Sequence, residues 1–217
     1  MPNKPVFDMS AWKKKAMAFV TRSHRHLWGK NNEDPLVFLF TRGLKNQFAK
    51  ELLLGWNKFS QERPIQNWGL NRVLTSDEKL FLPSGIVIPY IVEKELVSVF
   101  IHPYEEHKND KTTMIPGSLS PTMVLGEKKK KIAIIQDIFD GLFLFQETCE
   151  TCCVVIHPDP DLPLSNHCRS ILKTAGTLFI FSSDKIKNIK NKKAFLELPD
   201  HCFYAYQSKE QLIPCVV

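Results

Sequence analysis

The second half of the chain alternates short apolar runs with segments of helical spacing, and this alternation constrains the fold more than any other feature. From residue 132 the runs are "IAIIQ", "IFDGLFLFQ", "CCVVIH", "LSNHCRSILKTA", "TLFIFS", "KIKNIKNKKAFLE" and "CFYAY", in the order strand, helix, strand, helix, strand, helix, strand. Strands and helices in strict turn predict a parallel sheet with helices on its faces. Sites in such sheets lie at the carboxyl ends of the strands. We therefore expect Gln136, Asp137, His157 and residues 182–184 near one edge of the sheet.

The start of the chain has a helical pattern of apolar residues instead. Residues 10–28 place apolar side chains at helical spacing, and Ser10 is the expected N-cap. A second helix is predicted to begin with Asp34 as its cap and to stop at Gly43. The segment "KNQFAKELLL" predicts a third helix that runs to Gly55. The first quarter of the chain is therefore expected to be helical.

A β region and a boundary are predicted next. The segment "KLFLPSGIVIPYIVEKELVSVFIHPY" (79–104) is rich in Val, Ile and Phe, and its Glu93–Glu95 predicts the turn of a hairpin. Residues 108–121 are polar, which indicates a loop or linker. We therefore predict an α/β protein with two domains. The first, 1–120, has helices and then a β region, and the second, 121–217, has a parallel sheet with flanking helices.

Composition sets the broad class. The chain has 217 residues, of which 43% are hydrophobic and 24% charged, as in ordinary globular proteins. No segment reaches the roughly 18 consecutive apolar residues of a membrane span, and the first ten residues lack the pattern of a secretory signal. We expect a cytoplasmic protein with no membrane contact. The six cysteines are then expected to be reduced rather than paired in disulfides.

The net charge of +6 comes largely from local runs at Lys13–Lys15, Lys128–Lys131 and Lys185–Lys193. Runs of this kind suit the phosphate backbone of a nucleic acid. The alternative is that they are solvated faces with no ligand, and charge alone favours that alternative. Trp12, Trp28, Trp56 and Trp68 have apolar spacings and are expected in the core rather than in contact with bases.

Several pieces of sequence together resemble a known family. They are "AWKKKAMAFVTRSHRHLW", "FTRGL", "LGWN", "WGL", "LFLPSGIVIPY" followed by "VFIHP", "PGS" and finally "IAIIQDIFDGLFLFQ". This ordered set, from about Ser10 to Tyr206, resembles the catalytic core of DnaG-type primases, in particular small phage or plasmid primase-like proteins with a TOPRIM domain. The resemblance implies a primase-like N-terminal subdomain over 1–120 and a TOPRIM domain over 121–217.

The resemblance also implies where catalytic acids should stand. In that family a glutamate ends a TOPRIM strand and a glycine follows. An aspartate then opens the helix, and a later strand ends in an Asp-x-Asp pair. The glutamate is an acid/base and metal-site residue, and the aspartates are Mg²⁺ ligands, because Mg²⁺ takes hard oxygen ligands and neutralises phosphate charge.

This chain departs from that pattern. The glutamate position is Gln136, the glycine is Asp137, and the helix aspartate is Asp140. The Asp-x-Asp pair falls on residues 182–184, of which only Asp184 is acidic. A glutamine has no negative charge and transfers no proton near neutral pH. Gln136 is therefore a degenerate catalytic position, and Asp140 and Asp184 are the remaining candidates for metal ligands.

Each acid also has an interpretation without chemistry. Replacement of the missing glutamate by Asp137 would need a slip of one residue, which would turn the strand "AII" inside out. Asp140 would interact with the dipole at the start of its helix, and Asp184 would cap the following basic helix. We favour these structural roles.

The family also has a basic site where a strand of the β region ends in arginine. Here that strand ends at His102, and Glu105 and Glu106 follow, whereas Lys111 and "PGS" match the family. We expect the basic runs close to the active edge of the sheet or on the helix that follows it. The candidate nucleic-acid-binding residues are Lys111, Lys128, Lys129, Lys130 and Lys190.

Two further clusters suggest metal sites. The segment "CETCC" offers Cys149, Cys152 and Cys153, with His157, His167 and Cys168 downstream, as possible zinc ligands. Small buried thiols are the alternative that we favour. The segment "HPDPD" places Asp159 and Asp161 two residues apart, but its prolines favour an exposed turn over a metal site.

The hypothesis that follows is a catalytically inactive primase-like protein. The apolar framework persists while acids are missing, so we expect an accessory role through a protein partner, with DNA or RNA as a second partner and no cofactor. Such proteins are expected beside mobile-element or antiviral, CRISPR-associated genes. The alternative is an active primase or related phosphotransferase that uses Asp140 and Asp184, with Asp137 as a third candidate, and Mg²⁺ or Mn²⁺. A nucleic-acid binder with no protein partner is a third option.

Overall fold

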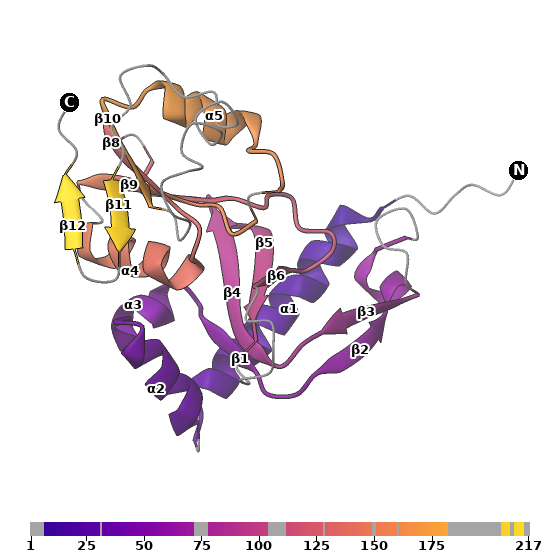
Figure 1. Cartoon of the computed structure of the whole chain (residues 1–217). Helices are drawn as coiled ribbons and strands as arrows, with labels where there is room; N and C mark the ends of the chain where they lie inside the picture. Colours follow the sequence, from indigo (N-terminus) through magenta and orange to yellow (C-terminus); the bar gives the residue numbers. More distant parts are fainter. Residues whose placement is uncertain are drawn as a thin grey trace, which may run out of the picture. The chain divides into compact units, whose positions relative to one another are not determined.

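A computed structural model of the chain describes residues 7–30, 32–71, 78–103, 112–127, 129–148, 151–159, 161–181, 205–208 and 211–214. The chain divides into two compact units, Met1–Ser120 and Pro121–Val217 (Figure 1). The helices are α1 (Met9–Leu27), α2 (Glu33–Thr41), α3 (Asn46–Glu51), the 3-10 helix η1 (Ile65–Trp68), α4 (Ile138–Thr148) and α5 (Asn166–Lys173). The strands of the first unit are β1 (Gly55–Asn57), β2 (Gln61–Pro64), β3 (Lys79–Leu82), β4 (Gly85–Val92), β5 (Glu95–His102) and β6 (Thr113–Met114). Those of the second are β7 (Met123–Leu125), β8 (Lys131–Ile135), β9 (Cys152–Ile156), β10 (Thr177–Phe181), β11 (Ala205–Ser208) and β12 (Gln211–Pro214).

The first unit is built on an antiparallel sheet of order β1-β4-β5-β6, beside a two-stranded ribbon of β2 and β3. Strands β4 and β5 form the predicted hairpin. Glu93 and Lys94 connect them with φ values of 49° and 69°. Two successive residues with positive φ are typical of the tight turn that matches the twist of a hairpin.

Helix α1 packs against β1, β4 and β5, and lies behind the sheet in Figure 1. Its apolar face enters a core whose buried members are Trp12, Ala16, Phe19, Val20, Ile65, Trp68, Leu70, Leu80, Leu82, Val87, Leu96, Val99, Ile101 and Ile115. The indole N–H of Trp12 donates to the carbonyl oxygen of Pro116 across 2.8 Å. At Gly55 of β1, an added Cβ would lie 2.6 Å from the backbone of α1 at His24. Helix and sheet are therefore fixed in close contact.

Three predicted helix ends in this unit differ from the structure. Helix α1 is capped by Asp8, whose Oδ1 accepts the backbone N–H of Ala11, and not by Ser10. Helix α2 begins at Glu33, so Asp34 lies inside its first turn. Helix α3 ends at Glu51, because the backbone N–H of Leu54 turns back to Ala49 and buries the Leu54 side chain.

The second unit contains a sheet of order β10-β8-β9-β7. Strands β10, β8 and β9 are parallel, which confirms the prediction from alternating strands and helices. Strand β7 was not predicted, and it pairs with β9 in the antiparallel direction. The sheet is therefore mixed, with a short antiparallel strand at one edge.

Helices α4 and α5 cover opposite faces of this sheet (Figure 1). Helix α5 packs on the face that carries Ile132, Ile134 and Val155. On the other face an added Cβ at Gly141 of α4 would lie 2.5 Å from Ile156 of β9. A larger residue at position 141 would push α4 off the sheet.

Two elements were predicted near the C-terminus, a strand and a helix. The predicted strand "CFYAY" corresponds in part to β11, which pairs in the antiparallel direction with β12 and does not extend the parallel sheet. The expectation of a further parallel strand there is therefore wrong. The predicted helix over 185–197 lies outside the described residues. Among the helices that the structure describes, none is both long and apolar enough for a membrane crossing.

Candidate functional site at the carboxyl ends of the parallel strands

The carboxyl end of β8 carries Gln136 and Asp137, both half-buried. The Oδ1 atom of Asp137 accepts the backbone N–H groups of Phe139 and Asp140, each across 2.9 Å. Those amides belong to the first turn of α4, where backbone donors have no partner within the helix. Asp137 therefore acts as an N-cap. The Oδ1 of this carboxylate is therefore engaged at the start of a helix.

Asp140 lies in the first turn of α4 and is exposed. A carboxylate in this place interacts favourably with the partial positive charge of the helix N-terminus. The second candidate metal ligand, Asp184, lies outside the described residues together with Ser182 and Ser183. The pairing of Asp140 with Asp184 stays a prediction.

At the carboxyl end of β9, His157 is buried and both of its ring nitrogens have partners. Nε2 lies 2.9 Å from the carbonyl oxygen of Leu162, and Nδ1 lies 2.8 Å from the hydroxyl oxygen of Thr122. A carbonyl only accepts, so Nε2 carries the hydrogen and Nδ1 accepts from Thr122. Burial lowers the pKa of His157, which favours this neutral form. His157 thus fastens the loop after β9 and is not presented to a ligand.

The "HPDPD" segment forms part of that loop. Asp159 accepts the backbone N–H of Asp161 through its Oδ1 across 3.3 Å, and its carbonyl oxygen accepts from Leu162. This is the local turn chemistry expected of an aspartate between prolines.

Among the described residues, the candidate zinc ligands do not come together. Cys152 and Cys153 are buried in β9, and Cys168 is buried in α5. Nε2 of His167 instead lies 3.0 Å from a carboxylate oxygen of Glu127. In the described parts of the chain no three His, Cys, Asp or Glu side chains come together as a metal site. Cys149 lies outside those parts.

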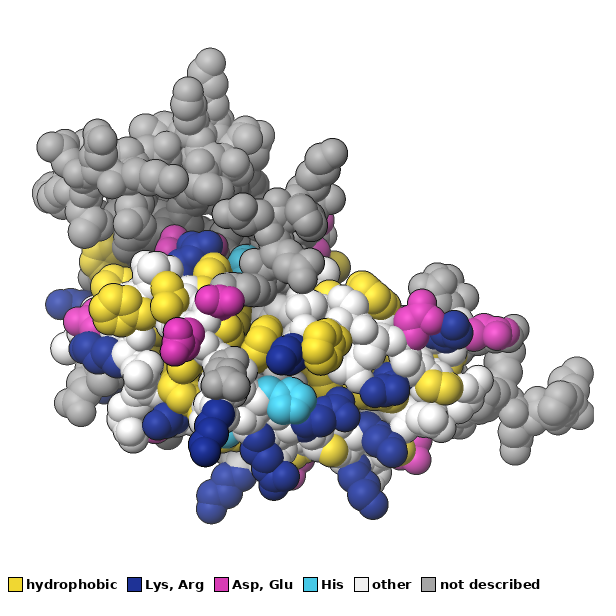
Figure 2. Space-filling view, turned by 90° about the horizontal axis from the view of Figure 1, so that it is seen from below, with side chains coloured by type: hydrophobic (Ala, Val, Ile, Leu, Met, Phe, Trp, Pro, Cys, Tyr) yellow, Lys and Arg dark blue, Asp and Glu magenta, His cyan; other side chains and the backbone are white. Residues whose placement is uncertain are grey.

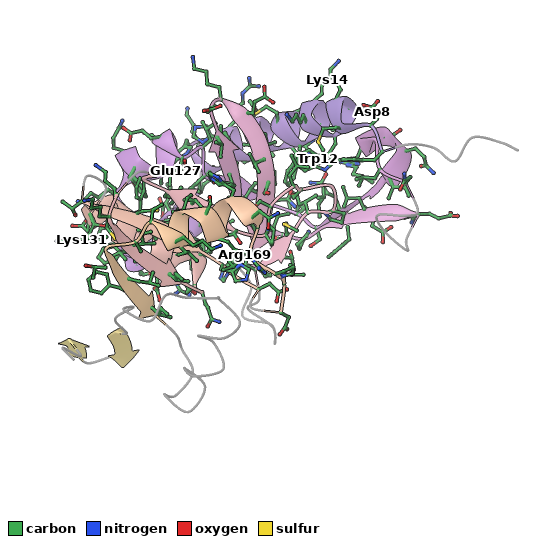
Figure 3. All side chains as sticks on the ribbon, turned by 90° about the horizontal axis from the view of Figure 1, so that it is seen from above. Asp8, Trp12, Lys14, Glu127, Lys131 and Arg169 are labelled. Atoms are coloured by element: carbon green, nitrogen blue, oxygen red, sulfur yellow. The ribbon has the colours of Figure 1, made fainter. Side chains whose placement is uncertain are left out.

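The basic run before β8 lies at the opposite edge from Gln136. Lys131 is the first residue of β8 (Figure 3). The carbonyl oxygen of Lys130 accepts the backbone N–H groups of Gly176 and of Thr177, the first residue of β10. A strand rises about 3.3 Å per residue, so the six steps from Lys130 to Gln136 span about 20 Å. The expectation that Lys129 and Lys130 lie near the carboxyl edge is wrong, because they precede the strand. Lys111, Lys128 and Lys190 lie outside the described residues.

The end of β5 carries a buried histidine, His102, where the family resemblance implied an exposed cation. His102 is 5% exposed, and its Nδ1 lies 3.0 Å from the hydroxyl oxygen of Thr112. Its ring stacks on that of Phe38 with centroids 5.7 Å apart, and the guanidinium of Arg42 lies 5.4 Å from the centroid of the Phe38 ring. Arg42 is thus the cation of this cluster, and sequence reasoning missed it. The i, i+4 spacing of Phe38 and Arg42 was the available signal.

The sequence matches no model of a protein family. It also matches no curated protein. Solved structures do match. The structure of the DnaG catalytic core superposes with a TM-score of 0.67 at 8% identity, over 93% of this chain and 73% of that chain. The RNA polymerase domain of Mycobacterium tuberculosis primase DnaG gives 0.66 at 12% identity, over 95% and 78%. The DnaG primase catalytic domain bound to ssDNA gives 0.66 at 8%, over 94% and 75%.

The chain has the fold of a primase catalytic core. At these identities the likeness shows the fold alone, and it bears out the primase-like part of the resemblance seen in the sequence.

Proposed function

We propose that this chain is an accessory protein with a primase-like fold that binds nucleic acid and a protein partner without synthesising primers itself. The observation that carries the proposal is the pair at the end of β8. Gln136 is uncharged, and the acid directly beside it, Asp137, is engaged by the backbone N–H groups of Phe139 and Asp140.

Among the described residues, the donor set at the carboxyl end of β8 does not fit the Mg²⁺ of a phosphoryl-transfer site. Such an ion is held by carboxylate oxygens that also offset the charge of the transferring phosphate. Among the described residues near the end of β8, Asp140 is the other carboxylate besides Asp137. One exposed carboxylate beside an amide is a weak ligand set for a hard divalent cation.

The nucleic-acid part of the proposal draws support from the fold. One structure of the same fold is a DnaG primase catalytic domain bound to ssDNA, and another is a primase RNA polymerase domain in complex with double-stranded DNA. The net charge of +6 agrees with a polyanionic partner.

The protein partner draws support from α2. Val37 is 57% exposed and Phe40 is 77% exposed, and their i, i+3 spacing places them on one side of the helix. Adjacent large apolar side chains on a surface are typical of interaction sites.

The test is primer synthesis on single-stranded DNA with labelled ribonucleotides and Mg²⁺ or Mn²⁺. The wild-type chain, an Asp140→Asn variant and an active DnaG primase are run side by side, after circular dichroism has shown that both forms of this chain are folded. We expect product only from the active primase. Product from the wild type that Asp140→Asn abolishes would overturn the proposal and favour the alternative, a metal-dependent primase.

A further inference from the structure

Helix α1 carries five lysines and arginines, Lys13, Lys14, Lys15, Arg22 and Arg25, and contains no acidic residue. Its buried side is occupied by Trp12, Ala16, Phe19, Val20, Ser23 and Leu27. Figure 3 shows Trp12 directed into the unit and Lys14 directed away from it. Figure 2 shows Lys and Arg side chains gathered along one border of the face that it draws.

Four of the five cations are exposed, namely Lys14, Lys15, Arg22 and Arg25, and we call them the α1 basic stripe. Lys13 differs, because its Nζ forms an ion pair with Glu95 at the start of β5. No member of the α1 basic stripe has an acidic partner among the residues that the structure describes. Arg22 instead lies over the ring of Phe19, with its Cζ 5.9 Å from the centroid. Within the described part of the chain, the positive charge of the stripe is therefore not compensated by a carboxylate.

The spacing places these cations on one side of the helix. At 100° per residue, the four side chains fall within an arc of about 100°. The exposed residues between them include Ala18 and Thr21, which are too small to keep a ligand away. Lys14 and Arg25 are eleven residues apart, about 16 Å along the axis. One strand of DNA carries a phosphate about every 3.4 Å of helix axis, so the stripe matches the length of about five phosphates.

We infer that the α1 basic stripe binds the phosphate backbone of a nucleic acid. An anionic membrane is disfavoured, because a helix lying on a membrane inserts its apolar face, and the apolar face of α1 is already buried against the sheet. An acidic protein is disfavoured, because protein interfaces pair mixed polar and apolar groups, whereas the stripe offers cations over a smooth helix surface. A regular row of phosphates is the ligand that requires only charge at intervals.

The inference rests on the nucleic-acid-binding part of the proposed function and gives it a location. It places the contact on the first unit. Of the lysines that sequence reasoning selected, the two that the structure describes, Lys129 and Lys130, lie in the second. The two locations can be separated by mutation, so the test can reject the stripe while leaving nucleic-acid binding itself intact.

The experiment measures fluorescence anisotropy of a labelled twenty-nucleotide oligothymidylate at several salt concentrations. The stripe variant is Lys14→Gln/Lys15→Gln/Arg25→Gln, which spares Arg22 because of its contact with Phe19. The matched control, Lys45→Gln/Lys94→Gln/Lys173→Gln, removes the same charge from exposed positions elsewhere. A third variant is Lys129→Gln/Lys130→Gln. Circular dichroism and thermal unfolding check that each variant is folded.

We expect the stripe variant to bind at least tenfold more weakly, and the slope of log K against log salt to flatten by about 2, since each lost contact to a single strand removes about 0.7. The matched control should stay within threefold of the wild type. Retained binding by the stripe variant, with loss in Lys129→Gln/Lys130→Gln, would overturn the inference and keep the proposed function. No binding by the wild type would overturn both.

Two other probes test the class of partner. Polyglutamate of similar charge and vesicles of phosphatidylcholine with phosphatidylserine are offered to the wild type and to the stripe variant. We expect binding of either probe to be at least tenfold weaker than that of the oligonucleotide. Equal or tighter stripe-dependent binding of polyglutamate or of vesicles would overturn the assignment to nucleic acid.

Discussion

The Oδ1 of Asp137 lies 2.9 Å from the backbone nitrogen of Asp140, so the first acid after β8 accepts a hydrogen bond from the backbone of the second. A carboxylate held in this way satisfies helix donors that would otherwise lack partners. The side chain of Asp140 is left on the exposed side of the first turn of α4. The two acids at the start of α4 are therefore held differently.

The capping role of Asp137 predicts an effect on stability. We expect Asp137→Ala to lower the free energy of unfolding by about 1 kcal/mol, because two amides of α4 lose their acceptor. Asp137→Asn keeps an acceptor oxygen, so it should lower the free energy of unfolding much less. Urea denaturation followed by circular dichroism measures both. Equal losses for the two variants would show that the charge of Asp137, and not its capping geometry, is what matters.

His157 predicts a dependence of stability on pH. Burial lowers its pKa in the folded chain, so below the pKa of an unfolded histidine, roughly 6.5, the unfolded state takes up a proton that the folded state does not. The contribution of His157 to the free energy of unfolding is fully present above that pH, and it is lost as the pH falls toward the pKa of His157 in the folded chain. Protonation also conflicts with the acceptance by Nδ1 of the hydrogen bond from Thr122.

We therefore expect the wild type to lose stability between pH 7 and pH 5 more steeply than a His157→Asn variant, although the variant is less stable at pH 7. Urea denaturation at several pH values gives the comparison. A difference between the two proteins that stays constant over this range would contradict the prediction. Thr122→Val serves as a control, because it removes the hydroxyl partner of His157 and keeps nearly the same side-chain volume.

The buried thiols predict low reactivity. Burial raises the pKa of Cys153 and of Cys168 to about 12, and it raises the pKa of Cys152 as well. At pH 8 a thiol with a pKa of about 12 is ionised in roughly one molecule in ten thousand, and the thiolate is the form that reacts. We expect iodoacetamide to leave these three cysteines unmodified in the folded protein and to modify them in urea, as read by peptide mass spectrometry. Rapid modification of Cys153 or Cys168 in the folded state would show that β9 or α5 opens readily.

Part of this structure followed from the sequence through local patterns. The alternation of apolar strand and helix segments predicted the parallel strands β8, β9 and β10, because burial on both faces requires continuous apolar runs. The turn at Glu93 and Lys94 predicted the β4–β5 hairpin. The short strand β7 was missed, since three residues carry no period, and its pairing with β9 depends on contacts distant in sequence.

The site was less accessible to sequence reasoning. Gln136 and Asp140 were assigned to the correct edge by their place after β8. Lys129 and Lys130 were assigned to the wrong edge, because closeness in sequence was taken for closeness in space across a strand. The run at Lys13–Lys15 was noticed, but its division into Lys13, paired with Glu95, and exposed Lys14 and Lys15 depends on tertiary packing.

An acid introduced at position 136 tests whether the carboxyl end of β8 can hold a metal. We expect Gln136→Glu to bind Mn²⁺ about tenfold more tightly than the wild type, because a second carboxylate would join Asp140 at the carboxyl edge and affinity rises with the number of charged ligands. Isothermal titration measures the affinity, and the gain should disappear in Gln136→Glu/Asp140→Asn. Asp137→Asn in the Gln136→Glu background should keep the gain, since the Asp137 carboxylate is engaged by α4. A gain that survives the loss of Asp140 would mean that the introduced carboxylate binds the ion with other residues, and that Asp140 has only its role at the helix terminus.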